Sequence, residues 1–387
     1  MRRLIANLFA SLEGSAGDRA GEICSEGKRS RRTVVAWGAL RGLAVPLISV
    51  VVLVAAGSPG LAQTPGSSNT PEDPTDASSS SWEASTLRAD DVGAFMDEKI
   101  PEQLEELKVP GAAVSVVADG RQIFAKGYGL ADIENERPIV AERTTLHINS
   151  VSKLFTATAV MQLVEQGKLD LDTDVNEYLT EFEIRDTYPG NPVTLRHLLT
   201  HTAGFEDPLI EPDGGSGGDS PDLGEYLADS QPERVRPPGQ VHSYSDYGFE
   251  LAGYLVQVRS GVPFERYVEQ QIFAPLGMTN TMFAAERSYD NQAPSVGVVS
   301  TASDMSRFML AHLGNGAVGG DRILKESTAK LMQRRQFGQD PSLPGLTYAF
   351  FEAYIGEASL TRLRPNHTLA IVPRSPSTPP PRSSRSA

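Results

Sequence analysis

The 387-residue sequence has very little cysteine, which limits the kinds of site that it can form. Its one cysteine, Cys24, cannot close an intramolecular disulfide or build a metal site from several thiolates. The six histidines do not occur in the H-E-x-x-H spacing of zinc hydrolases or in another ligand-rich cluster. We therefore expect neither a metal nor a cofactor at the functional site.

Basic residues are also scarce, since 35 lysines and arginines stand against 49 aspartates and glutamates. The resulting net charge of −14 argues against a nucleic-acid-binding surface, which needs clustered lysine and arginine. A hydrophobic content of 40% and a charged content of 22% are typical of globular proteins. The composition therefore indicates a globular protein without a nucleic-acid partner.

The apolar run from Gly42 to Ala56 is shorter than the ~20 residues of a comfortable membrane span, and Pro46 interrupts it. Basic residues precede this run, and small residues lead to a plausible cleavage site at Gly60-Leu61-Ala62. Residues 1–62 are therefore predicted to be a signal peptide, which would export the protein to the periplasm or the extracellular space. An uncleaved membrane anchor is the alternative.

Composition divides the rest of the chain into three parts. Residues 63–86 are rich in Pro, Ser, Thr and Asp, which predicts a disordered linker. Residues 87–357 carry the apolar periodicity of one folded domain. Residues 358–387 contain five arginines and no acidic residue, and they end in a Pro/Ser-rich stretch. This change within an acidic protein predicts a low-complexity tail, of the kind that a shifted reading frame would produce.

The start of the domain shows clear local patterns. Apolar spacing after Asp90-Asp91 predicts a helix that ends before Val109. Two apolar runs, Ala112–Ala118 and Arg121–Tyr128, are joined by Asp119-Gly120, a dipeptide that favours a two-residue hairpin turn. A short strand is expected at Thr145–Ile148, directly before a helix that begins at about Ser150.

The segment Ser150-Val151-Ser152-Lys153 places a nucleophile candidate one helical turn from an amine. Serine is a poor nucleophile at neutral pH, and a neighbouring neutral amine can accept its proton. The S-x-x-K pattern also occurs at Ser25 to Lys28 and at Ser327 to Lys330, so the spacing alone does not select a site.

Six ordered segments distinguish the Ser150 copy from the other two. They are Val109–Ala113, His147–Thr156, Thr194–Phe205, Pro238–Gly239 with Tyr244–Gly248, Pro275–Met278 and Ser300–Met305. In this order they resemble the class C β-lactamase-related serine hydrolases of the β-lactamase and penicillin-binding protein superfamily. The resemblance covers about residues 90–356. It implies an α/β (α+β) fold of the β-lactamase/DD-peptidase type, with an antiparallel sheet flanked by helices and a helical subdomain.

The resemblance also implies roles for the matching residues. Ser150 would be acylated by an ester, amide or β-lactam carbonyl, and its own backbone N–H would form half of the oxyanion hole. Lys153 would help to deprotonate it. Tyr244, as a phenolate beside the lysine, would share the proton transfer. The substrate would be a small ester, a β-lactam or a peptide.

Two departures from the family pattern weaken this expectation. The second motif normally ends in Asn, but here the substrate-binding position is Asp246, which can only accept hydrogen bonds when ionised. Its carboxylate would hold Lys153 charged, or it would shift the substrate preference. The third motif, Lys-Thr-Gly, is absent, and the one His-x-Gly, at His312-Leu313-Gly314, is expected to end a helix.

The missing motif predicts that the C-terminal strands of the family's sheet are missing too, together with one oxyanion donor. We therefore expect poor folding or low activity. Two hypotheses stay open at this point. The chain is an exported serine hydrolase with impaired activity, or it is a non-catalytic binding protein or truncated pseudoenzyme that keeps the fold.

Three other groups are expected to be structural. His197 and His201 match a segment that supports the site through hydrogen bonds. The alternating Asp170, Asp172 and Asp174 lack the glycine and glutamate of a calcium hand, which predicts a solvated turn. The literal Y-x-N at Tyr289–Asn291 lacks the flanking features of the second motif, which predicts a loop.

Overall fold

The computed structural model describes residues 88–206, 222–284, 292–340 and 343–352 with their side chains. For residues 49–54, 353–355, 358–362 and 371–373 it describes the backbone. Tyr289–Asn291, most of the predicted signal segment and the whole predicted linker lie outside the described residues.

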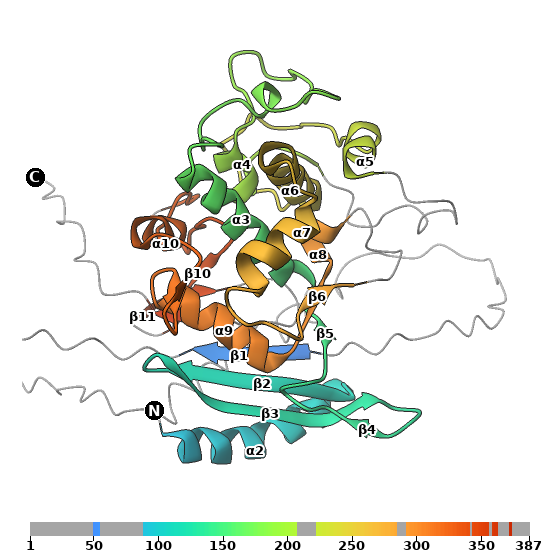
Figure 1. The fold of residues 1–387 in the computed structure, drawn as a ribbon, viewed down its shortest axis with the longest axis vertical. Helices are drawn as coiled ribbons and strands as arrows, with labels where there is room; N and C mark the ends of the chain where they lie inside the picture. Colours follow the sequence, from blue (N-terminus) through green and yellow to red (C-terminus); the bar gives the residue numbers. More distant parts are fainter. Residues whose placement is uncertain are drawn as a thin grey trace, which may run out of the picture.

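The main sheet is built on the predicted hairpin, at one end of the molecule (Figure 1). Strands β2 (Gly111–Ala118) and β3 (Arg121–Asp132) pair antiparallel. At the turn, Asp119 and Gly120 have φ angles of 50° and 73°. Asp and Gly tolerate this left-handed region better than other residues, which is why the dipeptide identified the turn correctly.

Two further strands complete this sheet, in the order β1-β2-β3-β4. Strand β4 (Arg137–Pro138) pairs antiparallel with β3, whereas β1 (Ser49–Val54) pairs parallel with β2. The sheet is therefore antiparallel apart from β1, whose residues belong to the predicted signal or anchor segment. Export and membrane anchoring stay predictions.

The two faces of β2 bury alternate residues, as the period of a strand requires. Val114 and Val116 pack with Met96 of helix α2 (Ala89–Leu107), which covers one face. Ala113 and Val117 join the main core on the other face, where Ser115 Oγ donates to the Ala302 carbonyl at 2.9 Å. Figure 1 shows α2 and α9 (Ala302–Leu313) on opposite sides of the sheet.

Helix α3 (Lys153–Glu165) runs through the helical part of the molecule, and every residue from Lys153 to Leu163 is buried. This burial explains why its sequence is apolar almost all round rather than on one stripe. Other helices surround it (Figure 1). Their bounds are α4 (Leu195–Leu199), α5 (Leu223–Asp229), α6 (Asp246–Ser260), α7 (Phe264–Val268), the π-helical turn η3 (Glu269–Phe273), α8 (Ala293–Val296) and α10 (Glu326–Gln333).

The remaining strands form three small antiparallel sheets. They are β5 (Leu146–His147), β7 (Val298–Ser300) and β6 (Met282–Phe283); β8 (Ala317–Val318) and β9 (Asp321–Arg322); and β10 (Phe351–Ile355), β11 (Ala358–Arg362) and β12 (Ile371–Pro373). Among the described strands, none that follows Ser150 hydrogen-bonds to the β1–β4 sheet. Strands β11 and β12 lie in residues 358–387, the segment whose composition predicted a low-complexity tail.

Aromatic packing fixes α3, so we expect Phe155→Ala to destabilise the protein strongly. Phe155 is fully buried, and its ring lies 5.0 Å from that of Phe273 and 4.3 Å from that of Phe308. Large-to-small substitutions at such positions cost about 3–5 kcal/mol through lost transfer energy and the cavity left behind. Chemical denaturation measures this loss. A change below about 1 kcal/mol would show that α3 does not depend on this cluster.

No helix among the described residues has both the length and the apolar character needed to cross a membrane.

Candidate active site

Ser150 lies in the short turn η1 (Asn149–Ser152), which leads directly into α3. The helical start that the sequence predicted at this position is confirmed. The residue before it, Asn149, has a φ of 46°, an uncommon conformation outside glycine that turns the chain sharply after β5. Strand β7 holds the turn in place, since Ile148 N–H donates to the Val298 carbonyl and Val298 N–H donates to Ser152 Oγ, at 3.2 and 3.1 Å.

Lys153 lies beside the serine, as the i, i+3 spacing predicted. Its side chain is only 3% exposed, and its Nζ donates to Ser150 Oγ at 3.4 Å and to the Ser295 carbonyl at 3.0 Å. A buried ammonium needs such partners because loss of hydration is costly. The serine–lysine pair is therefore held inside the molecule, while Ser150 itself is only half-buried and can be reached by a substrate.

Asp246 is the third member of this cluster. It is the first residue of helix α6, after Ser245, whose side chain caps the helix by accepting from Gly248 N–H at 2.9 Å. The Asp246 Oδ1 atom lies 2.5 Å from Lys153 Nζ, and the Asp246 side chain is 49% exposed. The carboxylate thus contacts the lysine on one side and is partly open to solvent.

The charge state of Lys153 follows from two opposing effects. Burial lowers the pKa of Lys153, but the interactions of Lys153 with Tyr244 and Asp246 outweigh burial and raise the pKa above its ordinary value. Lys153 is therefore an ammonium at neutral pH. The sequence-based expectation that the Asp246 carboxylate would hold the lysine charged agrees with this geometry.

Tyr244 completes the group that the sequence identified. Lys153 Nζ lies 5.1 Å from the centroid of the Tyr244 ring, and the Tyr244 hydroxyl is buried. That hydroxyl has no partner with hydrogen-bond geometry among the described residues. Lys153 and Tyr244 nevertheless interact closely enough to raise the pKa of Lys153, so the buried phenol lies beside the ammonium and is a candidate for proton transfer.

His201 positions the tyrosine rather than acting as a base. The two rings stack with centroids 4.2 Å apart, and His201 Nδ1 accepts from Ser245 N–H at 3.1 Å. Burial, assisted by the charge of Lys153, holds the pKa of His201 well below its ordinary value, so the ring is neutral. His197 forms a capping box with Thr194 at the start of α4, so both histidines make the hydrogen bonds expected of structural residues.

Two site residues were not identified from the sequence. Ser295 of α8 supplies the carbonyl that accepts from Lys153, and its Oγ donates to Glu250 Oε1 at 2.8 Å inside the core. Glu250 is 1% exposed and lies on α6, one turn after Asp246. Ser295 is 142 positions from Lys153 in the sequence, so no local sequence pattern links the two residues or identifies Ser295 as part of the site.

The His-x-Gly triplet ends helix α9, as expected. His312 is near the end of α9, with Gly314 following the helix, and its Nε2 pairs with Thr158 Oγ1 at 3.3 Å. Burial lowers the pKa of His312 to about 4, so it is a neutral core residue. Strand β10 also approaches the site, because the Phe351 ring lies 6.2 Å from that of His201.

The aspartate turn is also structural. Asp170 Oδ1 accepts from the backbone of Asp172, Asp174 caps the following turn, and Asp172 pairs with Arg196 at 2.6 Å. The arginine lowers the pKa of the Asp172 carboxyl. Among the described residues, no three His, Cys, Asp or Glu side chains are grouped so that they could hold a metal ion.

Comparisons with known proteins agree with this geometry. The family described as Beta-lactamase matches residues 96–358. A beta-lactamase of Yersinia enterocolitica is 31% identical over 316 residues, which cover 74% of this chain and 78% of the relative. Penicillin-binding protein 4 of Amycolatopsis lactamdurans is 30% identical over 279 residues, covering 63% of this chain and 70% of the relative.

Solved structures agree as well. The octameric penicillin-binding protein homologue from Pyrococcus abyssi superposes with a TM-score of 0.58 at 26% identity, covering 70% of this chain and 67% of that one. The fold class predicted from the ordered segments is therefore confirmed, in a chain whose nucleophile, lysine and tyrosine candidates are brought together.

Proposed function

Because the chain belongs to the beta-lactamase family, we propose that it is a serine hydrolase that forms an acyl-enzyme on Ser150. The observation that carries this proposal is the contact between Lys153 Nζ and Ser150 Oγ, at 3.4 Å, at the start of a buried helix. Ser150 Oγ attacks the substrate's carbonyl carbon, and its proton passes to the adjacent base. That base returns a proton to the leaving group, and water then cleaves the acyl ester.

Tyr244 is the better candidate for the base in this chain. Lys153 is held as an ammonium, and an ammonium cannot accept a proton. Its positive charge instead stabilises a Tyr244 phenolate, which can accept the Ser150 proton. Asp246 weakens this arrangement because it already compensates the charge of Lys153 at 2.5 Å. Low activity is the expected consequence.

The substrate is proposed to be a small ester, a β-lactam or a peptide amide. Each has a carbonyl carbon that the Ser150 oxygen can attack. Ser150 is only partly buried, so a substrate can reach its hydroxyl. We also propose that the protein is exported, on the basis of its apolar segment with basic residues before it and small residues after it.

Covalent labelling tests the proposed function. The purified full-length protein is incubated with a fluorescent penicillin and, separately, with a fluorophosphonate that reacts with activated serines. We expect at least one probe to label the wild-type chain at Ser150, as located by peptide mass spectrometry. A protein that melts cooperatively but reacts with neither probe would overturn the proposal.

A second candidate function is binding without catalysis, and Asp246 favours it. A carboxylate at this position compensates the lysine, and the described part of β10 contains no Lys-Thr-Gly motif. A folded protein that is not labelled, but binds a peptidoglycan peptide by calorimetry, would support this candidate instead.

The Asp246→Asn variant is expected to be more active than the wild type. Removing the carboxylate leaves the positive charge of Lys153 free to stabilise a Tyr244 phenolate. This favours deprotonation of Ser150, so we expect the second-order acylation rate at pH 7 to rise about tenfold, the effect of lowering the barrier by about 1.4 kcal/mol. The acid limb of the pH–rate profile should move to lower pH.

The matched control is Asp97→Asn, which removes a carboxylate from another lysine pair, that of Asp97 and Lys126 at 2.6 Å on α2 and β3. We expect this variant to leave the acylation rate unchanged. If Asp246→Asn is slower than the wild type at every pH, the carboxylate assists the reaction and its assigned role is wrong.

A further inference from the structure

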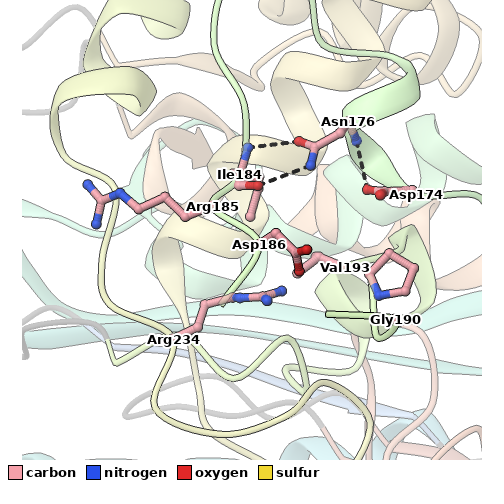
Figure 2. Close-up of a pocket in the computed structure, with 9 residues that line it drawn as sticks. Asp174, Asn176, Ile184, Arg185, Asp186, Gly190, Val193 and Arg234 are labelled. Carbon is pink, nitrogen blue, oxygen red and sulfur yellow. Dashed lines mark hydrogen bonds between the residues drawn. The ribbon is translucent and has the colours of Figure 1, made fainter. Parts of the chain in front are cut away.

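A cavity of about 200 Å³ lies in the helical part of the molecule, and Figure 2 shows the residues that line it. The chain between Asp174 and Val193 forms most of its wall, and Arg234 reaches it from a distant segment. Pockets for drug-sized ligands measure about 300–1,000 Å³, so this cavity fits a smaller molecule.

Arg234 is the unusual residue of this cavity. It is 7% exposed, and its Nε is buried without a hydrogen-bond partner among the described residues. Its backbone is fixed by an antiparallel bridge to Phe205, and the Tyr188 ring lies 5.5 Å from the guanidinium. Burial lowers the pKa of Arg234, which is the sign of an incompletely solvated cation. A buried donor left unpaired is costly, more so when it is charged, so a ligand that accepts from it would gain affinity.

The polar groups of Asn176 and of the Ile184 backbone in this wall already hydrogen-bond to each other. The Asn176 side chain accepts from Ile184 N–H at 2.7 Å and donates to the Ile184 carbonyl at 3.0 Å, while Asp174 accepts from Asn176 N–H (Figure 2). The Arg185 side chain points away from the guanidinium of Arg234 in the same view. Among these residues, the donor without a hydrogen-bond partner is the Nε of Arg234.

Two carboxylates limit the kind of ligand that the cavity can accept. Asp186 and Asp174 both act electrostatically on Arg234, but neither forms an ion pair with it within 4.0 Å among the described residues. Asp186 is exposed at the rim, and its carboxylate faces the guanidinium in Figure 2. A simple anion would be repelled by these carboxylates. A compact molecule with a negative and a positive end would satisfy both signs of charge.

We propose that this cavity binds a small zwitterion with the chemistry of a free α-amino acid. The ligand carboxylate accepts from the guanidinium of Arg234, and the ligand ammonium faces the Asp186 carboxylate at the rim. The site uses none of Ser150, Lys153, Tyr244 and Asp246. The proposed ligand binding can therefore be tested separately from the proposed hydrolase activity.

The test is a titration of the full-length protein, followed by saturation-transfer NMR. Glycine is the zwitterionic probe, while acetate and ethylammonium each carry one of its charges. We expect glycine to bind more tightly than either single-charge probe, and Ser150→Ala to bind it like the wild type. Equal signals from glycine and acetate would overturn the proposal, and so would the loss of glycine binding in Ser150→Ala.

Variants locate the site. Arg234→Met should weaken glycine binding about tenfold or more, the usual effect of removing a charged hydrogen bond, while the matched control Arg185→Ala should not. Because Arg234 is buried and its replacement can perturb folding, Asp186→Asn is the second test at an exposed position. It should weaken glycine binding and leave acetate binding equal or stronger. Unchanged glycine binding in Asp186→Asn would refute the assigned orientation and the proposal with it.

Discussion

Replacement of Ser150 by alanine is expected to abolish covalent labelling and to reduce hydrolysis by about 10⁴-fold or more. No other group in the described part of the site can form the acyl bond, because Lys153 is an ammonium and Tyr244 is placed to accept a proton. Loss of a serine nucleophile removes the covalent route, and losses of this order are typical of serine hydrolases. The measurement is the acylation rate with the probe that labels the wild type best.

The chain contains its own control for this experiment. Ser327 begins the same S-x-x-K pattern with Lys330, but it is exposed on α10. Ser327→Ala should react with the probe like the wild type. This result would show that the S-x-x-K spacing alone does not activate a serine and that the buried surroundings of Ser150 are needed. Labelling that persists in Ser150→Ala and disappears in Ser327→Ala would show that the wrong serine was assigned.

Lys153→Met should be the second most damaging substitution, with a loss of about 10²–10⁴ in the acylation rate, because proton transfer from Ser150 to Tyr244 depends on the lysine's charge. Methionine fills a similar space in the buried position, so the fold should be kept. The variant removes the cation that donates to Ser150 Oγ and stabilises a Tyr244 phenolate. We expect the double variant with Ser150→Ala to lose little more than Ser150→Ala alone, because residues that act as a unit are not additive.

Lys330→Met is the matched control, since Lys330 is exposed and pairs with Glu326 on the surface of α10. It should change neither the rate nor the pH profile. A Lys153→Met protein that melts like the wild type and reacts as fast would contradict the role of the lysine. Restored activity in Lys153→Arg would show that a positive charge suffices, as the phenolate mechanism requires.

The sequence identified features whose causes are local. The turn at Asp119-Gly120 formed because these two residues adopt positive φ angles readily, and the start of α3 fell where the S-x-x-K pattern predicted. The spacing within one helical turn places Lys153 beside Ser150. The family and the fold class followed from six ordered segments, which local patterns can reveal even when their contacts are unknown.

The C-terminal region shows where composition was insufficient. Residues 358–362 and 371–373 form short strands in a segment whose arginine- and proline-rich composition predicted a tail. Strand formation depends more on neighbouring strands than on intrinsic preference, so a composition count is a weak guide there. That the family's later strands are missing from the main sheet stays a prediction.

By itself, the sequence determined the nucleophile candidate, its lysine and the hairpin, because each depends on residues close together in the chain. Only the tertiary structure decided that Asp246 lies 2.5 Å from Lys153, that Ser295 supplies a carbonyl to it, and that Arg234 reaches a cavity wall formed some 40–60 positions earlier. These contacts join segments distant in sequence, and the packing of whole helices sets them. Whether the serine is active depends on these distant contacts, which fix the charge around it.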